Sequence, residues 1–242
     1  MKIRFKLINI SKTYNKNGKK NKILDNLNLN IYDSLVNAII GNSGEGKSTI
    51  AKLIMQIDDF CSGEIFYKSK NIKEYNIKIF RWENQIVFQN PFEAVNPYFK
   101  IKKIIEEPMI VRGIEKNKRN ERIEELMDLI KLPLATLKRK PHEVSGGQLQ
   151  RIVLARALSI EPEFLVLDEP FSSLDEITAY ELVKEFKRIF NELKIGVFYI
   201  SHNMERVLFL SDQINILKNK KIIVSEQKEN LTKTEILKFI NK

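Results

Sequence analysis

Residues 35–48 decide the fold, and they read LVNAIIGNSGEGKS. The first six are apolar apart from one asparagine, and the last eight match the pattern GxxxxGK[ST]. A buried strand that ends in a glycine-rich loop and opens a helix is the building unit of α/β proteins with parallel sheets. Backbone amides bared by glycines can face phosphate oxygens, and the helix N-terminus adds positive partial charge. This stretch therefore predicts a phosphate-binding loop on an α/β core.

Within this loop, Lys47 is expected to reach the β- and γ-phosphates of a nucleotide, and Ser48 to offer its hydroxyl to Mg²⁺. Glu45 places a carboxylate in the loop, and we expect its side chain to point to solvent. The loop residues assigned to nucleotide binding are Gly41, Asn42, Ser43, Gly44, Gly46, Lys47, Ser48 and Thr49.

A second apolar run, residues 164–167, ends in the acid pair Asp168 and Glu169. This pattern places Asp168 beside Mg²⁺ and Glu169 where it can polarise an attacking water. Consecutive acids after a buried strand thus favour hydrolysis. A kinase transfers the phosphoryl group to a bound acceptor instead, and nothing in the chain indicates an acceptor pocket.

Between these motifs lies VSGGQLQR at residues 144–151, followed by a helical pattern through Leu158. Ser145 can cap that helix while Gly146 and Gly147 bare their amides, which predicts a second anion site. One nucleotide does not need two such loops in one subunit. We therefore expect this loop to cover the γ-phosphate of ATP bound to another subunit in a head-to-tail dimer.

Strand and helix signals alternate along the rest of the chain. Apolar residues alternate with polar ones at 3–7 and 27–31, which predicts two half-buried strands around a polar loop at 15–22. Helical spacing predicts amphipathic helices between residues 100 and 140. The remaining predicted elements are a helix at 47–57, buried strands at 85–88, 164–167 and 195–200, strands near 215–217 and 222–224, and a helix opened by Thr232 or Thr234.

Composition narrows the function further. The chain has 242 residues, 43% of them hydrophobic, and one cysteine, Cys61, which indicates a globular protein from a reducing compartment. Its apolar runs are far shorter than the ~18–20 residues that cross a bilayer, so we expect a cytoplasmic protein. The net charge of +10 is compatible with nucleic acid or an anionic membrane surface, but the lysines are scattered and arginine-rich clusters with aromatics are absent.

Taken in order, these motifs resemble the ATP-binding cassette (ABC) family over essentially all 242 residues. Gln89 stands at the family's glutamine loop, SSLD at 172–175 is similar to its D-loop, and His202 matches its switch histidine. The resemblance implies that Tyr14 stacks on adenine, Gln89 touches Mg²⁺ or the water, and His202 contacts the γ-phosphate. Beyond the phosphate loop, the assigned residues are Tyr14, Ser145, Gly146, Gly147, Gln148 and Asp175 for the nucleotide, Glu169, His202 and Gln89 for catalysis, and Ser48, Gln89 and Asp168 for the metal.

The resemblance also implies the architecture: a P-loop NTPase core with a mostly parallel sheet, an N-terminal antiparallel β portion and an inserted α-helical subdomain. We expect one nucleotide-binding domain over residues 1–242. Its catalytic core comprises 1–90 and 151–242, and its helical subdomain with the signature loop comprises 91–150.

Segments such as FQNP at 88–91, EEP at 106–108 and KPHE at 140–143 are similar to the oligopeptide, dipeptide and nickel importer branch. Residues 94–97 read AVNP where that branch usually has SLNP. The cysteine-bearing extension and the HPYT segment of many peptide-type members are missing. This shorter form is more like the nickel and metallophore members, and it is equally compatible with a trimmed peptide importer. His142 belongs to this likeness and is expected to be structural.

The function predicted is an ATPase subunit of an importer of peptides or nickel and metal chelates, with ATP and Mg²⁺ as cofactors. Its expected partners are a second cassette, identical or different, a separate membrane permease, and indirectly a substrate-binding protein. We expect it at the inner face of the membrane, without nucleic acid. The alternative is a non-transport cassette ATPase acting on nucleic acid or ribosomes, favoured only by the charge. A small-molecule kinase is disfavoured because VSGGQLQR has no role there.

Overall fold

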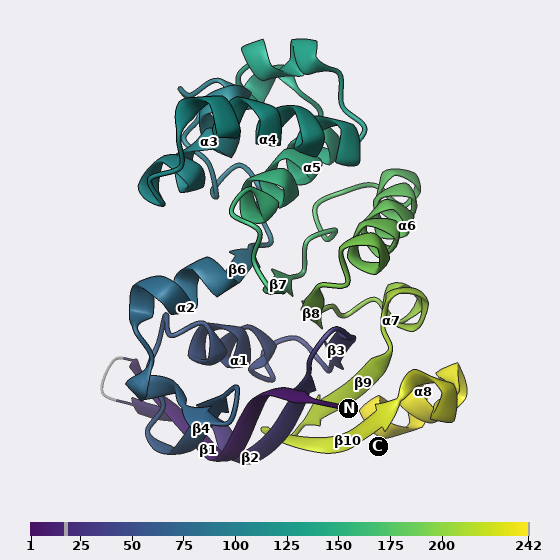
Figure 1. The fold of residues 1–242 in the computed structure, drawn as a ribbon. Coiled ribbons are helices and arrows are strands. Elements are labelled where there is room, and N and C mark those ends of the chain that lie inside the picture. Colours follow the sequence, from purple (N-terminus) through teal and green to yellow (C-terminus); the bar gives the residue numbers. More distant parts are fainter. Residues whose placement is uncertain (17–18, 242) are drawn as a thin grey trace. The chain divides into compact units, whose positions relative to one another are not determined.

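The computed structural model describes residues 1–16 and 19–241. The chain forms two compact units, the first from residues 1–81 and 194–242 and the second from residues 82–193 (Figure 1). It passes from the first unit to the second within helix α2 (Ile77–Glu83). It returns after helix α6 (Glu176–Leu193), so the second unit is an insertion in the first.

An antiparallel sheet forms one part of the first unit. Its strands stand in the order β2-β1-β4-β5. Aromatic rings fill its buried side, where Tyr67 lies with ring centroids 4.9 Å from Phe5 and 5.1 Å from Phe80. The strands are β1 (Ile3–Lys16), β2 (Lys19–Tyr32), β4 (Ser62–Tyr67) and β5 (Lys70–Asn71).

The predicted polar loop at residues 15–22 is wrong in its extent. Strand β1 continues to Lys16 and β2 begins at Lys19, with Tyr14 opposite Asn21 and Asn15 opposite Lys20. The backbone ladder of an antiparallel pair forms whatever the polarity of its side chains, so this exposed Asn/Lys segment extends the hairpin. Residues 17 and 18 lie outside the described part of the chain.

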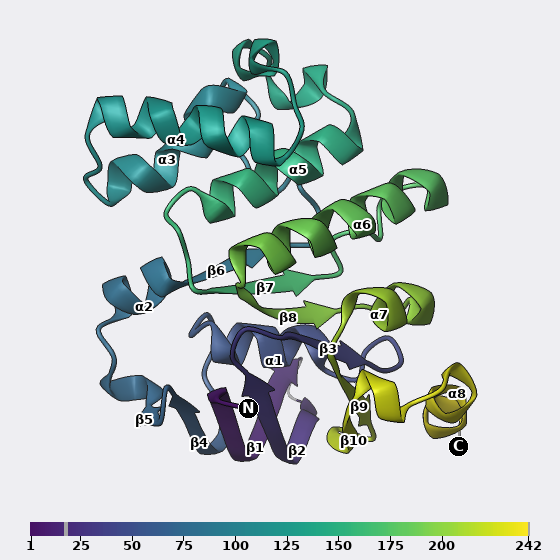
Figure 2. The same ribbon diagram turned by 45° about the vertical axis from the view of Figure 1, so that its right-hand side comes forward.

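The second sheet portion of the first unit carries the predicted buried strands. Its order is β10-β9-β3-β8, with β3 parallel to both neighbours and β10 antiparallel to β9. All residues of β3 and β8 are buried, as their apolar sequences predict. Helix α7 packs near β3 and α8 against β9 (Figure 2). The elements are β3 (Val36–Ile40), β8 (Gly196–Ile200), β9 (Gln213–Lys218), β10 (Lys221–Gln227), α1 (Lys47–Ile54), α7 (Met204–Leu210) and α8 (Lys233–Asn241).

Two helix ends test the predicted boundaries. Helix α1 stops at Ile54, three residues before the predicted end, because Gln56 adopts a left-handed backbone with φ of 52°. Thr232 opens α8, since its hydroxyl accepts a hydrogen bond of 3.3 Å from the Glu235 amide and its own amide donates to the Glu235 carboxylate at 2.8 Å.

The second unit combines two parallel strands with four long helices. The amphipathic helices expected between residues 100 and 140 are confirmed as α3 and α4, which pack with α5 (Figure 1). Their buried faces carry residues such as Ile104, Met109 and Leu126. The elements are β6 (Asn84–Val87), β7 (Phe164–Asp168), α3 (Ile101–Val111), α4 (Lys116–Leu129), α5 (Gly146–Leu158) and α6.

Short 3₁₀ turns join several of these elements: Ile72–Glu74, Leu134–Lys138, Pro141–Glu143 and Lys228–Asn230. The predicted α/β class, with parallel strands, an antiparallel β portion and an inserted helical part, is confirmed. Among the residues described, no helix has the length and apolar character needed to span a bilayer.

Candidate nucleotide-binding and catalytic site

The phosphate loop lies directly after β3, at the start of α1, as predicted. Lys47 is only 6% exposed, and its ammonium donates hydrogen bonds to the carbonyl oxygens of Gly41 at 2.8 Å and Asn42 at 2.9 Å. The cation therefore lies inside the curve of the loop. A charged donor held there is placed to exchange carbonyl partners for phosphate oxygens.

Two glycines of the loop leave no room for a side chain. Gly46 has a φ of 105°, and a Cβ there would lie 2.8 Å from Ile23 Cγ2. A Cβ on Gly41 would lie 2.3 Å from the backbone oxygen of Leu217. The loop backbone is thus packed closely against β2 and β9, and this fixes its amides in place.

The Glu45 side chain lies at the surface of the loop, beside a neighbouring turn. Its carboxylate accepts a hydrogen bond of 3.4 Å from the backbone amide of Lys220, in the turn between β9 and β10. Its own amide donates to Asn42 O at 3.4 Å. The carboxylate is therefore directed to a neighbouring turn, which adds a second anchor for the loop.

Tyr14 lies near the end of β1 and is half-buried. Its hydroxyl donates a 2.5 Å hydrogen bond to Asp58 Oδ2 and also interacts with the side chain of Thr49 on α1. The structure therefore brings Tyr14 to the helix that the phosphate loop opens. Burial and the hydrogen bond to Asp58 raise the pKa of Tyr14, so its ring carries a neutral hydroxyl.

His202 follows β8 in the same unit and is exposed. Strands β3 and β8 are parallel, with Ile39 opposite Ile200, so the phosphate loop and His202 both follow the carboxyl ends of adjacent strands. Ligands of open parallel sheets bind at this edge. The first unit thus carries Tyr14, the whole phosphate loop with Thr49, and His202.

In the second unit, the acid pair stands at the end of β7. Asp168 is its last residue, and Glu169 has a left-handed backbone with φ of 48°. A non-glycine residue there costs about 1–2 kcal/mol. The amide and the hydroxyl of Ser172 both donate to Glu169 O, at 3.2 and 3.0 Å, and hold this conformation.

The signature loop begins α5 with a capping box, confirming Ser145 as the helix cap. Ser145 Oγ accepts from the Gln148 amide at 3.2 Å, and the Gln148 side chain accepts from the Ser145 amide at 3.0 Å. Two of the first-turn amides are thereby used. The next two amides of the first turn belong to Gly146, which is partly exposed, and Gly147, which is buried, and helix geometry gives neither a carbonyl partner within α5.

The D-loop packs against this signature loop. A Cβ on Gly146 would lie 3.2 Å from Leu174, and one on Gly147 only 2.8 Å from Thr178. Asp175 caps α6, because its carboxylate accepts from the Thr178 amide at 2.9 Å, and this bond lowers the pKa of Asp175. Only glycines thus let α5 approach the start of α6 so closely.

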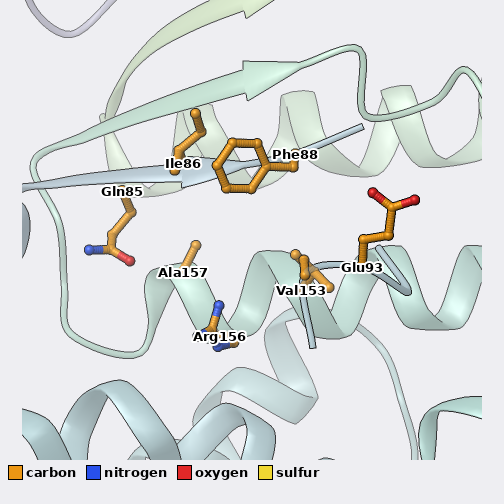
Figure 3. A pocket seen from close by; sticks show the side chains of 8 residues that line it. Gln85, Ile86, Phe88, Glu93, Val153, Arg156 and Ala157 are labelled. Carbon is orange, nitrogen blue, oxygen red and sulfur yellow. The ribbon is translucent and has the colours of Figure 1, made fainter. Parts of the chain in front are cut away.

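Gln89 follows β6 and is exposed, and its chain neighbour Phe88 lines a pocket of about 340 Å³. Figure 3 shows Gln85, Ile86 and Phe88 on one side of this pocket and Val153, Arg156 and Ala157 of α5 on the other. Arg156 also pairs with Glu107 at 3.0 Å. The residues lining the pocket are Gln85, Ile86, Phe88, Glu93, Ala94, Val153, Arg156 and Ala157. The second unit therefore carries Gln89, Ser145–Gln148 of the signature loop, Asp168, Glu169 and Asp175.

Sequence reasoning missed two residues beside Tyr14, namely Lys12 and Asp58. Lys12 Nζ lies 2.6 Å from Asp58 Oδ1 and 4.7 Å from the centroid of the Tyr14 ring. Lys12 is two positions from Tyr14 on the same strand, so the strand period of two places both side chains on one face. This spacing is the local signal that could have identified Lys12. Asp58 lies 46 positions after Lys12 in a connecting loop, and no sequence pattern points to it.

A phosphate loop on a parallel strand, an acid pair after a second strand and a further glycine-containing helix N-terminus are together typical of a nucleoside-triphosphate-binding protein. A family model described as ABC transporter matches residues 24–172. The chain belongs to this family, as its motifs predicted.

Curated relatives place the likeness more closely. "Oligopeptide transport ATP-binding protein OppF" of Streptococcus mutans serotype c is 37% identical over 222 residues, which are 89% of this chain and 72% of that protein. "Dipeptide transport ATP-binding protein DppF" of Lactococcus lactis subsp. cremoris is 37% identical over 92% of this chain and 75% of that protein.

Among solved structures, the cassette MJ0796, described as a dimeric post-hydrolysis state bound to ADP and Pi, matches with a TM-score of 0.82 and 27% identity. It covers 94% of this chain and all of that chain. CbiO1 from Clostridium perfringens matches with a TM-score of 0.86, over all of this chain and 95% of that chain, and at 24% identity shows the fold alone. The predicted cassette fold is confirmed.

Proposed function

We propose that this chain is the ATP-binding and ATP-hydrolysing subunit of a peptide importer. The observation that carries the proposal is the presence in one chain of a phosphate loop, with Lys47 buried inside its curve, and of a second glycine-containing helix N-terminus, where Ser145 caps α5 and Gly146 and Gly147 form its first turn. Relatives at 37% identity are named as ATP-binding proteins of oligopeptide and dipeptide transport, which supports the peptide branch over nickel.

Each site residue takes a distinct task in this proposal. Lys47 and the amides of residues 41–49 hold the phosphates, and Tyr14 stacks on the adenine. Glu169 accepts a proton from the attacking water, and Gln89 orients that water. His202 contacts the γ-phosphate, and Asp175 of the D-loop, whose carboxylate caps α6, belongs to the nucleotide-binding residues.

The donors assigned to Mg²⁺ fit that ion. Ser48, Gln89 and Asp168 supply hydroxyl, amide and carboxylate oxygens, the hard donors that Mg²⁺ prefers. Among the described residues, no group of three or more His, Cys, Asp or Glu could hold a metal. The bound ion would neutralise phosphate charge during hydrolysis.

The working form we propose is a head-to-tail dimer of cassettes, identical or different, on the inner face of the cell membrane. In it, the signature loop of each subunit completes the nucleotide site of the other. Residues 91–150 form the helical subdomain of a single nucleotide-binding domain, and the rest forms its catalytic core.

A substitution in the signature loop separates binding from dimerisation. Ser145→Arg should leave ATP binding to the monomer intact and abolish ATP-driven dimerisation, because a long side chain fills the space in front of the Gly146 and Gly147 amides. Analytical ultracentrifugation with ATP and without turnover measures this. Loss of ATP binding by the monomer, or dimerisation like that of the unaltered chain, would contradict the shared site.

Mixing two damaged chains tests the same idea through activity. If the chain forms homodimers, Ser145→Arg mixed with Lys47→Ala yields heterodimers with one doubly damaged site and one intact site. We expect ATPase activity in the mixture that neither variant shows alone. Absence of recovery at every ratio, with heterodimers demonstrated, would argue against composite sites.

The pocket beside Gln89 is our proposed contact for the permease. It combines apolar Ile86 and Phe88 with polar Glu93 and Arg156 (Figure 3), and Phe88 directly precedes Gln89, which is assigned to catalysis. A helix pressed into such a pocket could change the position of Gln89 and so couple transport to hydrolysis.

The importer and the nucleic-acid alternatives predict different activators. Permease in proteoliposomes should alter steady-state hydrolysis, whereas DNA, RNA or ribosomes should not. Ala94→Trp, which fills the pocket, should reduce the response to permease at least ~10-fold, since one blocked anchor site removes most of the docking energy. The matched control Ala135→Trp places the same side chain at an exposed position and should keep the response. Saturable, salt-sensitive stimulation by nucleic acid without a permease response would overturn the transporter assignment.

A further inference from the structure

The side chain of Asp58 lies at the centre of a cluster that the expected functions leave unexplained. Its Oδ2 accepts from the Tyr14 hydroxyl at 2.5 Å, and its Oδ1 accepts from Lys12 Nζ at 2.6 Å and from the Asp59 amide at 2.8 Å. Both oxygens of the carboxylate therefore accept from named donors, three in all. Such a carboxylate has a fixed orientation and fixes the groups around it.

Lys12 completes the cluster and lies against one face of the Tyr14 ring. It is only 8% exposed, and its ammonium also donates to the carbonyl oxygen of Asp59. The same ammonium lies over the Tyr14 ring, 4.7 Å from its centroid. Because a cation covers one face of the ring, a base can stack only on the other face.

The charges in the cluster balance. Burial acts to raise the pKa of Asp58, but the hydrogen bonds from Lys12 and Tyr14 outweigh it and lower that pKa below its ordinary value. Lys12 keeps its proton because its bond to Asp58 outweighs burial and raises its pKa. The pair is thus charged and intact at neutral pH, and no net charge is added beside the bound base.

Hydrogen bonds of backbone and side-chain groups connect this cluster to both β1 and α1. The Cys61 amide donates to Ser11 O at 2.8 Å, and the Thr13 amide donates to Cys61 Sγ at 3.4 Å. The Tyr14 hydroxyl also interacts with Thr49, in the first turn of α1. The distance between the ring and the phosphate loop is therefore set by the segment that follows α1.

We propose that Asp58, held in place by Lys12, is a positioning residue that fixes the Tyr14 ring as a preformed platform for the nucleotide base. The proposal rests on the proposed function, since it assumes that Tyr14 meets adenine. It adds that affinity for the base is set by a carboxylate that touches neither base nor phosphate. A ring already fixed loses less conformational entropy when the base stacks on it.

The test compares a ligand that has a base with one that has none. Dissociation constants for Mg-ATP and for Mg-tripolyphosphate are measured by calorimetry with the unaltered chain, Asp58→Ala, Tyr14→Phe and the double variant. We expect Asp58→Ala to weaken ATP binding about 3–10-fold and leave tripolyphosphate binding unchanged. In steady-state assays, KM for ATP should rise by a similar factor while kcat stays within about 2-fold.

Controls separate positioning from folding. Asp59→Asn alters the exposed neighbouring carboxylate and should change neither affinity. Tyr14→Phe keeps the ring and removes only its hydrogen bond, so it should reproduce much of the effect even if Asp58→Ala folds poorly. The double variant should be no worse than Asp58→Ala alone, because both substitutions remove one interaction. Asp58→Glu should restore part of the ATP affinity.

Three results would overturn the inference: unchanged ATP affinity in Asp58→Ala and Tyr14→Phe, equal loss of both ligands, or additive effects in the double variant. Failure of the proposed function is distinguishable from these. In that case, the unaltered chain would bind tripolyphosphate no less tightly than ATP, which would show that no base is recognised and would overturn both proposals together.

Discussion

Glu169→Gln is expected to lower ATP turnover by about 10²-fold or more while the protein still binds Mg-ATP. Glutamine has nearly the same shape as glutamate but cannot accept a proton from the attacking water. Binding depends on the phosphate loop in another part of the chain, so it should persist. Because ATP is no longer consumed, ATP-driven dimers should also last longer, and size-exclusion chromatography with ATP measures their fraction.

A matched control is available in the same unit. Glu161 also has a left-handed backbone, with φ of 53°, and its exposed carboxylate lies 3.9 Å from Arg122. Glu161→Gln should keep turnover near that of the unaltered chain, since an exposed ion pair at this distance contributes little. Near-normal turnover in Glu169→Gln, with ATP binding intact, would remove Glu169 from the role of general base.

The left-handed backbone at Glu169 could not be predicted from the sequence. Its direction is set by the strained φ of 48° and by two hydrogen bonds from Ser172. The sequence predicts the acids from the apolar strand before them, but it cannot show the strain. Only the fold reveals that the chain maintains an unfavourable conformation at this position.

Other parts of the fold were predictable to different degrees. The motif at residues 41–48 fixes the loop, because few residue types fit positions such as Gly46, where φ is 105°. The buried strands were found within one or two residues, since continuous apolar runs have few alternatives. The end of α1 was misplaced because Gln56, rather than a glycine, takes the left-handed position.

Contacts between distant segments could not be read from the sequence. Lys12 and Asp58 meet only because β1 and the segment after α1 lie side by side, and neither position belongs to a motif. The predicted loop at residues 15–22 was too long for a related reason. The side chains of residues 15, 16 and 19–22 are typical of a turn, but backbone pairing with the opposite strand decides their structure.

Lys47→Ala is expected to weaken ATP binding by about 10²-fold or more, in contrast to Glu169→Gln. The Lys47 side chain is buried, and its ammonium donates hydrogen bonds to the Gly41 and Asn42 carbonyl oxygens. These bonds hold the ammonium inside the curve of the loop. Without it, phosphate charge would enter the loop with only backbone amides to offset it. Lys52→Ala, on the exposed side of the same helix, should bind ATP normally. Fluorescence titration of both variants decides the matter: equal, unchanged ATP affinities would mean that this loop is not the nucleotide site.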